Sequence, residues 1–285
     1  MFDMMFFYVA LVGSSLAGLI DLKTTEIPDK IPYAMIAFGI IGYLIKSIII
    51  GSYFPILFSI MTGLIFLGFG LLMYFGGQWG GGDAKILSAI GFLLPYSIFQ
   101  TKTLFSFPLS YFFNVFLIGA AYMIVYIFIL SFIKREIWKE FFKYFKQNSL
   151  KLIKLNLIFA LSIMIFSSFA AYFYAYPFYF FIKLGGFLMI GTFLFFLFWK
   201  FAKTVETVGF KKKIPVSKLK EGDVLESSKI WEGITKEQLR KIKKSKKKYV
   251  TIKDGVRFAP AFPLALLFTF YYGDAIFWIL NYFIF

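Results

Sequence analysis

The 285-residue sequence contains no cysteine and no histidine. Without cysteine, the chain has no disulfide, no thiolate metal ligand and no catalytic thiol. Without histidine, it also lacks the Ser-His-Asp and Cys-His catalytic arrangements and the usual nitrogen ligand of zinc. Proton transfer near neutral pH must therefore depend on carboxylates, lysine or tyrosine.

Charged residues are also scarce, at 16% of the chain, whereas 60% of the residues are hydrophobic and 23% are aromatic. The mean hydropathy is +0.76, and a soluble domain is only about half apolar. The apolar residues come in runs close to the roughly 20 residues with which a helix crosses a bilayer. These features indicate a polytopic membrane protein.

We predict an all-α polytopic membrane protein with about eight transmembrane helices and a small cytoplasmic α/β domain before the last helix. The first three residues lack the basic group that opens a cleavable secretory signal, so we expect none. The expected spans cover residues 4–21, 31–50, 54–75, 83–100, 109–133, 156–175, 177–199 and 257–273.

Basic residues predict the orientation of these spans, because lysine and arginine concentrate in cytoplasmic loops. Seven lie between residues 134 and 154, and eighteen lie between residues 200 and 257. Eight spans put both groups on one side, together with the loops at 21–30 and 76–83. The net charge of +16 then fits contact with membrane lipids, and the sequence holds no nucleic-acid-binding motif.

The pattern along the chain predicts five regions. They are a catalytic transmembrane core at 1–133, an interfacial amphipathic helix at 134–155, an additional two-span unit at 156–199, a basic cytoplasmic domain at 200–256, and the last span with the C-terminus at 257–285.

The predictions for two of these regions rest on local sequence patterns. In 134–155, aromatic residues from Trp138 to Phe145 recur at helical spacing opposite the charges, which is typical of an interfacial helix; a plain helical linker is the alternative. In 200–256, Thr235 and Gln238 fit a capping box before a helix that ends near Lys244. Strand-like residues at 223–225 and 249–252 complete a small α/β domain.

Three acidic residues stand out at the membrane edge, namely Asp21, Glu26 and Asp83. Asp21 ends the first span and Asp83 begins the fourth, so both are expected at the same face and at similar depth. An ionisable group inside a span is costly and indicates function. Two neighbouring carboxylates share a proton, because both cannot ionise together. Such a pair activates water against a peptide carbonyl without a metal or cofactor, as in aspartic proteases.

Asp83 follows a run of glycines in GGQWGGGDAKILSAIGFLLPY, residues 76–96. Gly80, Gly81 and Gly82 permit backbone angles that other residues resist and allow an extended substrate to approach closely. An ordinary loop with an N-cap is the alternative. A phosphate-binding loop is excluded, because the G-x-x-x-x-G-K-[ST] pattern is absent.

These motifs resemble a known family. Gly80-Gly81-Gly82-Asp83 is similar to the GxGD motif of membrane aspartic proteases, and Asp21 with Leu22-Lys23-Thr24-Thr25-Glu26-Ile27-Pro28 resembles the first catalytic motif of type IV prepilin peptidases. The run from Gly255 to Pro260 is most similar to the archaeal branch, which includes preflagellin (prearchaellin) peptidases.

The resemblance implies an aspartic endopeptidase that removes class III signal peptides from pilin-like or archaellin precursors at the cytoplasmic face of the cell membrane. It implies Asp21 and Asp83 as the catalytic pair, with no metal and no organic cofactor. Gly80, Gly81, Gly82, Glu26 and Lys85 are the residues expected to bind substrate or shape the site. Bacterial relatives add a methyltransferase activity, which we do not expect here because the cysteine pairs are absent.

Two alternatives stay open at the level of sequence. A proton- or ion-coupled transporter would use the same carboxylates, although carriers usually bind their cargo at the membrane midplane. A membrane anchor for an assembly complex would keep full function without either carboxylate.

Overall fold

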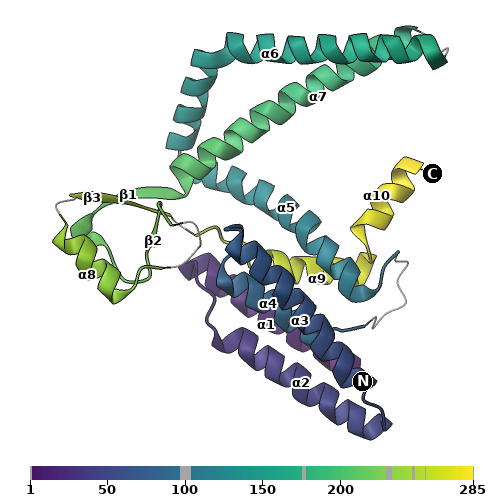
Figure 1. Cartoon of the computed structure of the whole chain (residues 1–285), viewed down its shortest axis with the longest axis vertical. Helices are drawn as coiled ribbons and strands as arrows, with labels where there is room; N and C mark the ends of the chain where they lie inside the picture. Colours follow the sequence, from purple (N-terminus) through teal and green to yellow (C-terminus); the bar gives the residue numbers. More distant parts are fainter. Residues whose placement is uncertain are drawn as a thin grey trace. The chain divides into compact units, whose positions relative to one another are not determined.

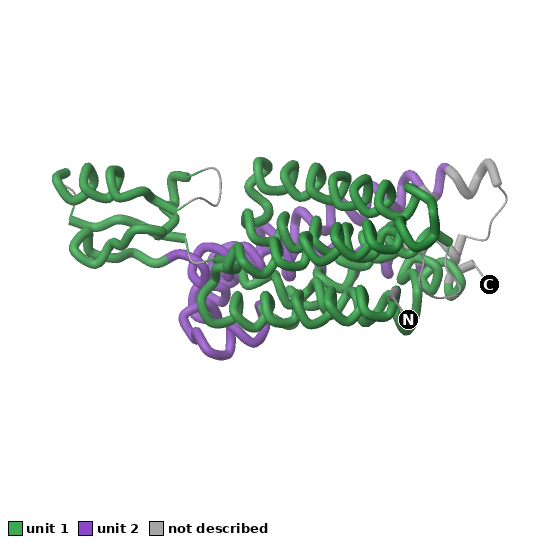
Figure 2. The backbone as a smooth tube through the Cα atoms, turned by 90° about the horizontal axis from the view of Figure 1, so that it is seen from below, with its two compact units in different colours: residues 1–126, 212–285 green, residues 127–211 purple. Residues whose placement is uncertain are grey.

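A computed structural model describes residues 2–96, 104–174, 178–228, 233–245, 248–253 and 255–284 (Figure 1). The chain forms two compact units, which Figure 2 colours separately. The first contains residues 1–126 and 212–285, and the second contains residues 127–211.

Long apolar helices make up most of the first unit, which confirms the predicted polytopic membrane architecture. Across both units, six described helices are long and apolar enough to cross a membrane. The number is seven if the last two helices form one bent span. The helices of this unit are α1 (Phe2–Thr24), α2 (Lys30–Ile50), α3 (Phe54–Phe75), α4 (Gly81–Leu93), the first part of α5 (Phe107–Ile133), α9 (Ala261–Tyr272) and α10 (Ala275–Ile284).

The difference from the expected eight spans lies in α4. The sequence predicted a span over 83–100, but α4 has 13 residues and rises about 20 Å, which is less than the roughly 30 Å of a bilayer core. Pro95 disfavours helical geometry at the residue before it. The last carbonyls of α4 are instead bound by other helices: Ser59 Oγ donates to Phe92 O at 2.6 Å, and Tyr43 Oη donates to Leu93 O at 2.9 Å. Residues 97–100 lie outside the described residues.

Helix α4 is buried along almost its whole length and packs against α2 and α3. Close approach to α3 requires a residue without a side chain at Gly63, where an added Cβ would lie 2.2 Å from the Phe92 ring. Helices in membranes pack closely through small residues of this kind. Helix α4 is therefore held in place by neighbouring helices rather than by lipid.

The last span is broken between α9 and α10, which meet at an angle of 57°. Gly273 takes a left-handed conformation there, with φ of 74°, and the break leaves backbone groups without helical partners. Asn114 of α5 satisfies two of them. Its Nδ2 donates to Gly273 O at 2.7 Å, and its Oδ1 accepts from Ala275 N at 3.0 Å.

Asn114→Ala is expected to lower the free energy of unfolding by about 1–3 kcal/mol, because it leaves buried backbone groups unpaired. Unfolding in detergent, followed by circular dichroism, measures the loss. Asn148→Ala is the matched control, since Asn148 donates to Tyr144 O within its own helix. Equal stability of the two variants would contradict this account of the break.

The small α/β domain before the last span is confirmed. Its sheet has the strand order β1 (Lys211–Pro215), β3 (Tyr249–Lys253), β2 (Val224–Leu225), with β2 and β3 antiparallel. Helix α8 (Lys236–Lys244) starts at the predicted capping box: Thr235 N donates to Gln238 Oε1 at 2.9 Å, and Gln238 N donates to Thr235 Oγ1 at 3.3 Å.

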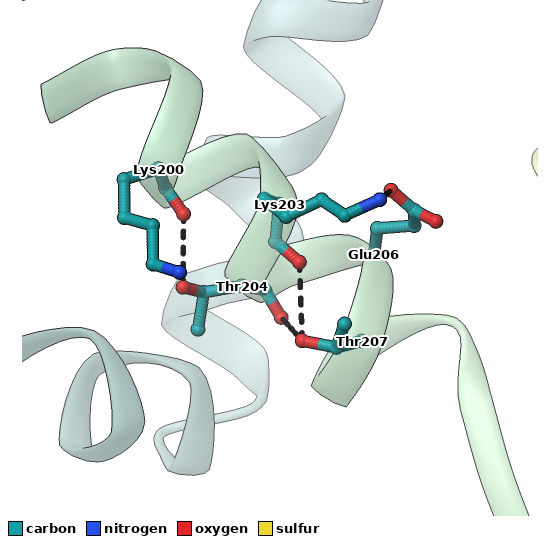
Figure 3. Close-up of polar contacts among 5 residues, drawn as sticks. All are labelled: Lys200, Lys203, Thr204, Glu206 and Thr207. Carbon is teal, nitrogen blue, oxygen red and sulfur yellow. Dashed lines mark hydrogen bonds and ion pairs between the residues drawn. The ribbon is translucent and has the colours of Figure 1, made fainter. Parts of the chain in front are cut away.

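The second unit contains the end of α5, α6 (Glu136–Tyr174) and α7 (Phe178–Thr204). Helix α6 is continuous from Glu136 to Tyr174. It contains most of the expected interfacial helix at 134–155 together with the expected first span of the two-span unit. The expected turn at 175–177 lies outside the described residues. Figure 3 shows the end of α7, where threonine hydroxyls bond to carbonyls of the preceding turn: Thr204 Oγ1 donates to Lys200 O at 2.9 Å. A π-helical turn, Val205–Gly209, follows.

Candidate active site

The first carboxylate, Asp21, lies in the last turn of α1 and is 5% exposed. The helix ends just beyond it, where Thr25 takes a left-handed conformation and its N–H donates to Asp21 O at 2.8 Å. The side chain accepts a hydrogen bond from far along the sequence, because Ala259 N donates to Asp21 Oδ2 at 3.1 Å. One backbone N–H thus fixes one oxygen of this carboxylate.

The second carboxylate, Asp83, lies in the first turn of α4 and is 8% exposed. Its Oδ2 accepts from Gly80 N at 3.0 Å, so the side chain closes the turn that starts the helix. The positive end of the helix dipole favours a carboxylate at this position. The motif therefore places an acid at the start of a buried helix, as the sequence indicated.

The structure brings the two carboxylates together. Helices α1 and α4 pack against each other (Figure 1). Asp21 and Asp83 line one cavity of about 770 Å³, and they are close enough for a Coulomb interaction between them. Both are largely withdrawn from water, so this interaction is weakly screened. Two ionised carboxylates in such a setting would repel each other.

The cavity is lined by segments that are distant in sequence. They include the loop after α1, the turn before α4, one face of α5 around Gly119, the turn 220–224 with residues of β3 in the small domain, and the segment 255–258. Among the described residues, five acidic and two basic ones line it: Asp21, Glu26, Asp83, Glu221 and Asp223, with Lys220 and Lys253. The chain as a whole has 31 basic and 15 acidic residues. The lining of the cavity is therefore mainly acidic, whereas the chain is mainly basic.

Of the three glycines expected to shape the site, Gly82 is in the tightest contact. A Cβ at Gly82 would lie 2.8 Å from Ile27 Cβ, in the loop after α1. At Gly81, a Cβ would lie 3.8 Å from Tyr74, and at Gly80 it would lie 3.4 Å from the Asp83 carboxylate. Gly82 thus permits the close approach of the two segments that carry the carboxylates.

Glu26 and Lys85, the other expected site residues, occupy different places. Glu26 lines the cavity and is exposed. Lys85 forms an ion pair with Asp29 at 2.6 Å and lies over the Tyr33 ring. In the described part of the chain, Lys85 is not among the residues that line the cavity. The described residues also contain no group of three acidic side chains arranged to hold a metal ion.

Sequence reasoning gave no role to Trp79 or to the backbone of Ala259. Trp79 is 6% exposed and stacks on Phe116, with Phe258 and Phe262 around it, so it forms an aromatic wall of the cavity. The sequence feature that could have indicated a role for Trp79 is its position in the glycine-rich turn, directly before the GxGD motif. The Ala259 contact had no local signal, because it joins residues 238 positions apart.

The N-terminal part of the chain is similar to a known family. Residues 7–134 match the type IV leader peptidase family. This confirms the resemblance that the motifs indicated. The region that matches the leader peptidase family contains both Asp21 and Asp83, and it ends before the second unit's long helices and the small domain.

Three archaeal relatives are similar to the chain. A preflagellin peptidase of Methanocaldococcus jannaschii is 35% identical over 91 residues, covering 31% of this chain and 38% of the relative. A preflagellin peptidase of Methanococcus voltae is 33% identical over 132 residues, covering 43% and 54%. The prepilin peptidase EppA of Methanothermobacter thermautotrophicus is 24% identical over 153 residues, covering 49% and 40%. The chain thus spans between about two fifths and a little over half the length of these relatives.

Proposed function

We propose that this chain is a membrane-embedded aspartic endopeptidase that removes class III signal peptides from pilin-like or archaellin precursors. The observation that carries the proposal is the meeting of Asp21 and Asp83, both buried, on one cavity. Both lie in the region that matches the type IV leader peptidase family. The names of the relatives support precursor proteins as the substrates.

The pair of carboxylates supplies the chemistry for peptide hydrolysis. The ionised carboxylate takes a proton from a water molecule, whose oxygen attacks the carbonyl carbon of the scissile bond. The protonated carboxylate donates a hydrogen bond to the carbonyl oxygen and stabilises the negative charge that develops there. As the C–N bond breaks, a proton passes to the leaving nitrogen, so that the products are a carboxyl terminus and a new amino terminus.

The cavity fits a basic extended peptide better than an apolar one. Its acidic lining attracts a positively charged leader, and the turn 220–224 of the small domain forms one wall of it. We place the site at the cytoplasmic face of the cell membrane, because the small domain in the lysine-rich region of the chain forms one wall of the cavity and basic residues concentrate on the cytoplasmic side.

Cleavage of a purified precursor tests the proposal. The protein in detergent is incubated with a panel of pilin-like and archaellin-like precursors that carry basic leaders, and mass spectrometry maps the products. The expected cut lies just before the hydrophobic segment. Failure of folded wild-type protein to cut any of the panel, together with carboxylate-dependent ion flux in proteoliposomes, would favour a transporter instead.

Lys85→Gln is expected to keep cleavage within about twofold of wild type, because an ion pair between half-exposed side chains contributes little. The side chains of Lys85 and Asp29 are 31% and 57% exposed. Initial rates of precursor cleavage measure the effect, and Glu26→Gln is the comparison on the cavity lining. A tenfold loss in Lys85→Gln would show that this lysine acts on the site.

A further inference from the structure

We propose that Arg257 is a positioning residue for the Asp21 carboxylate, which it serves by fixing the segment 255–260 against the end of α1. The inference rests on the proposed function and adds a part of the site that lies outside the region matched by the leader peptidase family, residues 7–134.

The guanidinium of Arg257 joins two helices. Its Nε donates to Leu22 O at 2.9 Å, and its Nη1 donates to Tyr126 Oη at 2.8 Å. Leu22 O belongs to the last turn of α1, where carbonyls have no partner within the helix. A cation at this end also interacts favourably with the helix dipole. Arg257 therefore caps α1 one residue after Asp21.

The backbone carbonyl of Arg257 also has a hydrogen-bond partner. Tyr122 Oη of α5 donates to Arg257 O at 2.8 Å. Farther along the segment, an added Cβ at Gly18 of α1 would lie 3.1 Å from Pro260 Cα, so the segment lies directly on the α1 backbone. The chain is thus fixed on both sides of Ala259, at residues 257 and 260.

This arrangement aims one N–H at the carboxylate. Ala259 is fully buried, and its N–H donates to Asp21 Oδ2. The hydrogen bond fixes one oxygen of the Asp21 carboxylate, and Asp21 lines the cavity. The positive charge of Arg257 also acts on Asp21, and a guanidinium keeps this charge at any working pH.

Arg257 acts through Asp21 rather than on the substrate. Gly255, Val256 and Phe258 line the cavity, whereas in the described part of the chain Arg257 is not among the lining residues. Its side chain is engaged with the end of α1 and with α5. Loss of the guanidinium is therefore expected to disturb the orientation of Asp21 and to leave the substrate-binding walls in place.

The test compares Arg257→Gln, Arg257→Lys and Tyr126→Phe with wild type. Arg240→Gln, the same change on an exposed residue of α8, is the matched control. Two readouts are taken on each protein: kcat and KM for precursor cleavage, and hydrogen–deuterium exchange of peptides covering residues 255–260. Thermal unfolding identifies a variant that does not fold, in which case Arg257→Lys and Tyr126→Phe decide the question.

In Arg257→Gln, kcat is expected to fall about 10- to 100-fold, because a small misplacement of a reacting group lowers the rate by about this factor. KM is expected to stay within about twofold of wild type. Arg257→Lys keeps the charge and should recover part of kcat. Exchange of the 255–260 peptides should be faster in Arg257→Gln and unchanged in Arg240→Gln.

Either of two results overturns the inference: exchange in Arg257→Gln that equals wild type, or a rise in KM with kcat unchanged. The exchange readout needs no activity. If wild type cleaves no precursor, the proposed function fails, whereas unchanged exchange in Arg257→Gln would remove the positioning role by itself.

Discussion

Asp21→Asn and Asp83→Asn are each expected to abolish precursor cleavage, with a loss on the order of 10²–10⁴-fold or more, the range that general acid–base catalysis contributes. The amide is neither a general base nor a general acid near neutral pH, so the pair loses its base or its acid. The amide oxygen still accepts the hydrogen bonds from Ala259 N and Gly80 N. Both variants should therefore insert and fold. Initial rates with a fluorescent precursor measure the loss.

Asp29→Asn is the control for this pair of variants. Asp29 is an acid at the same end of the membrane helices, and it binds Lys85 outside the cavity lining. Its cleavage rate should stay near that of wild type. Wild-type cleavage by either Asp21→Asn or Asp83→Asn would show that the two carboxylates do not form the catalytic pair.

Gly82→Ala is expected to reduce cleavage at least tenfold, because its Cβ would lie 2.8 Å from Ile27 Cβ. The branch point of Ile27 cannot rotate away, so the loop after α1 must move and the two carboxylates separate. Displacements of this size at a reacting group cost up to about 100-fold. Cleavage rates and thermal unfolding together measure the effect.

Gly81→Ala is the matched control, since its Cβ would be in ordinary contact 3.8 Å from Tyr74. A second variant tests the cause. Ile27→Gly removes the Ile27 Cβ that the new Cβ would meet, so the double variant Gly82→Ala/Ile27→Gly should be more active than Gly82→Ala alone. Equal activity of Gly82→Ala and Gly81→Ala would show that the close approach at Gly82 is not required.

The sequence predicted the parts of the fold whose signals are local. Thr235 and Gln238 lie three residues apart and bond to each other, so the start of α8 was visible in the chain. The same holds for Asp83, because the glycine run and the acid lie within one turn of the helix that they start.

The length of α4 was not predictable in this way. Its apolar run continues toward residue 100, whereas the helix ends at Leu93. Partners from α2 and α3, Tyr43 and Ser59, bind the final carbonyls, and nothing in the run itself indicates them. Hydropathy measures how apolar a run is, but the point where its helix stops depends on distant donors.

Arg257 was likewise not assigned a role. An arginine ahead of an apolar span has the ordinary appearance of a positively charged membrane flank. Its function depends on Leu22 and Tyr126, which are 235 and 131 positions away, and so it becomes visible only in three dimensions.

The contact between Asp21 and Ala259 joins residues that are 238 positions apart. A ribosome making this protein therefore synthesises both aspartates long before the residue that orients Asp21. The helices that enter the membrane first carry Asp21 and Asp83, but this hydrogen bond forms only after residue 259 has been added. A chain that terminates before residue 259 already carries both aspartates and still lacks the hydrogen bond that orients the first of them.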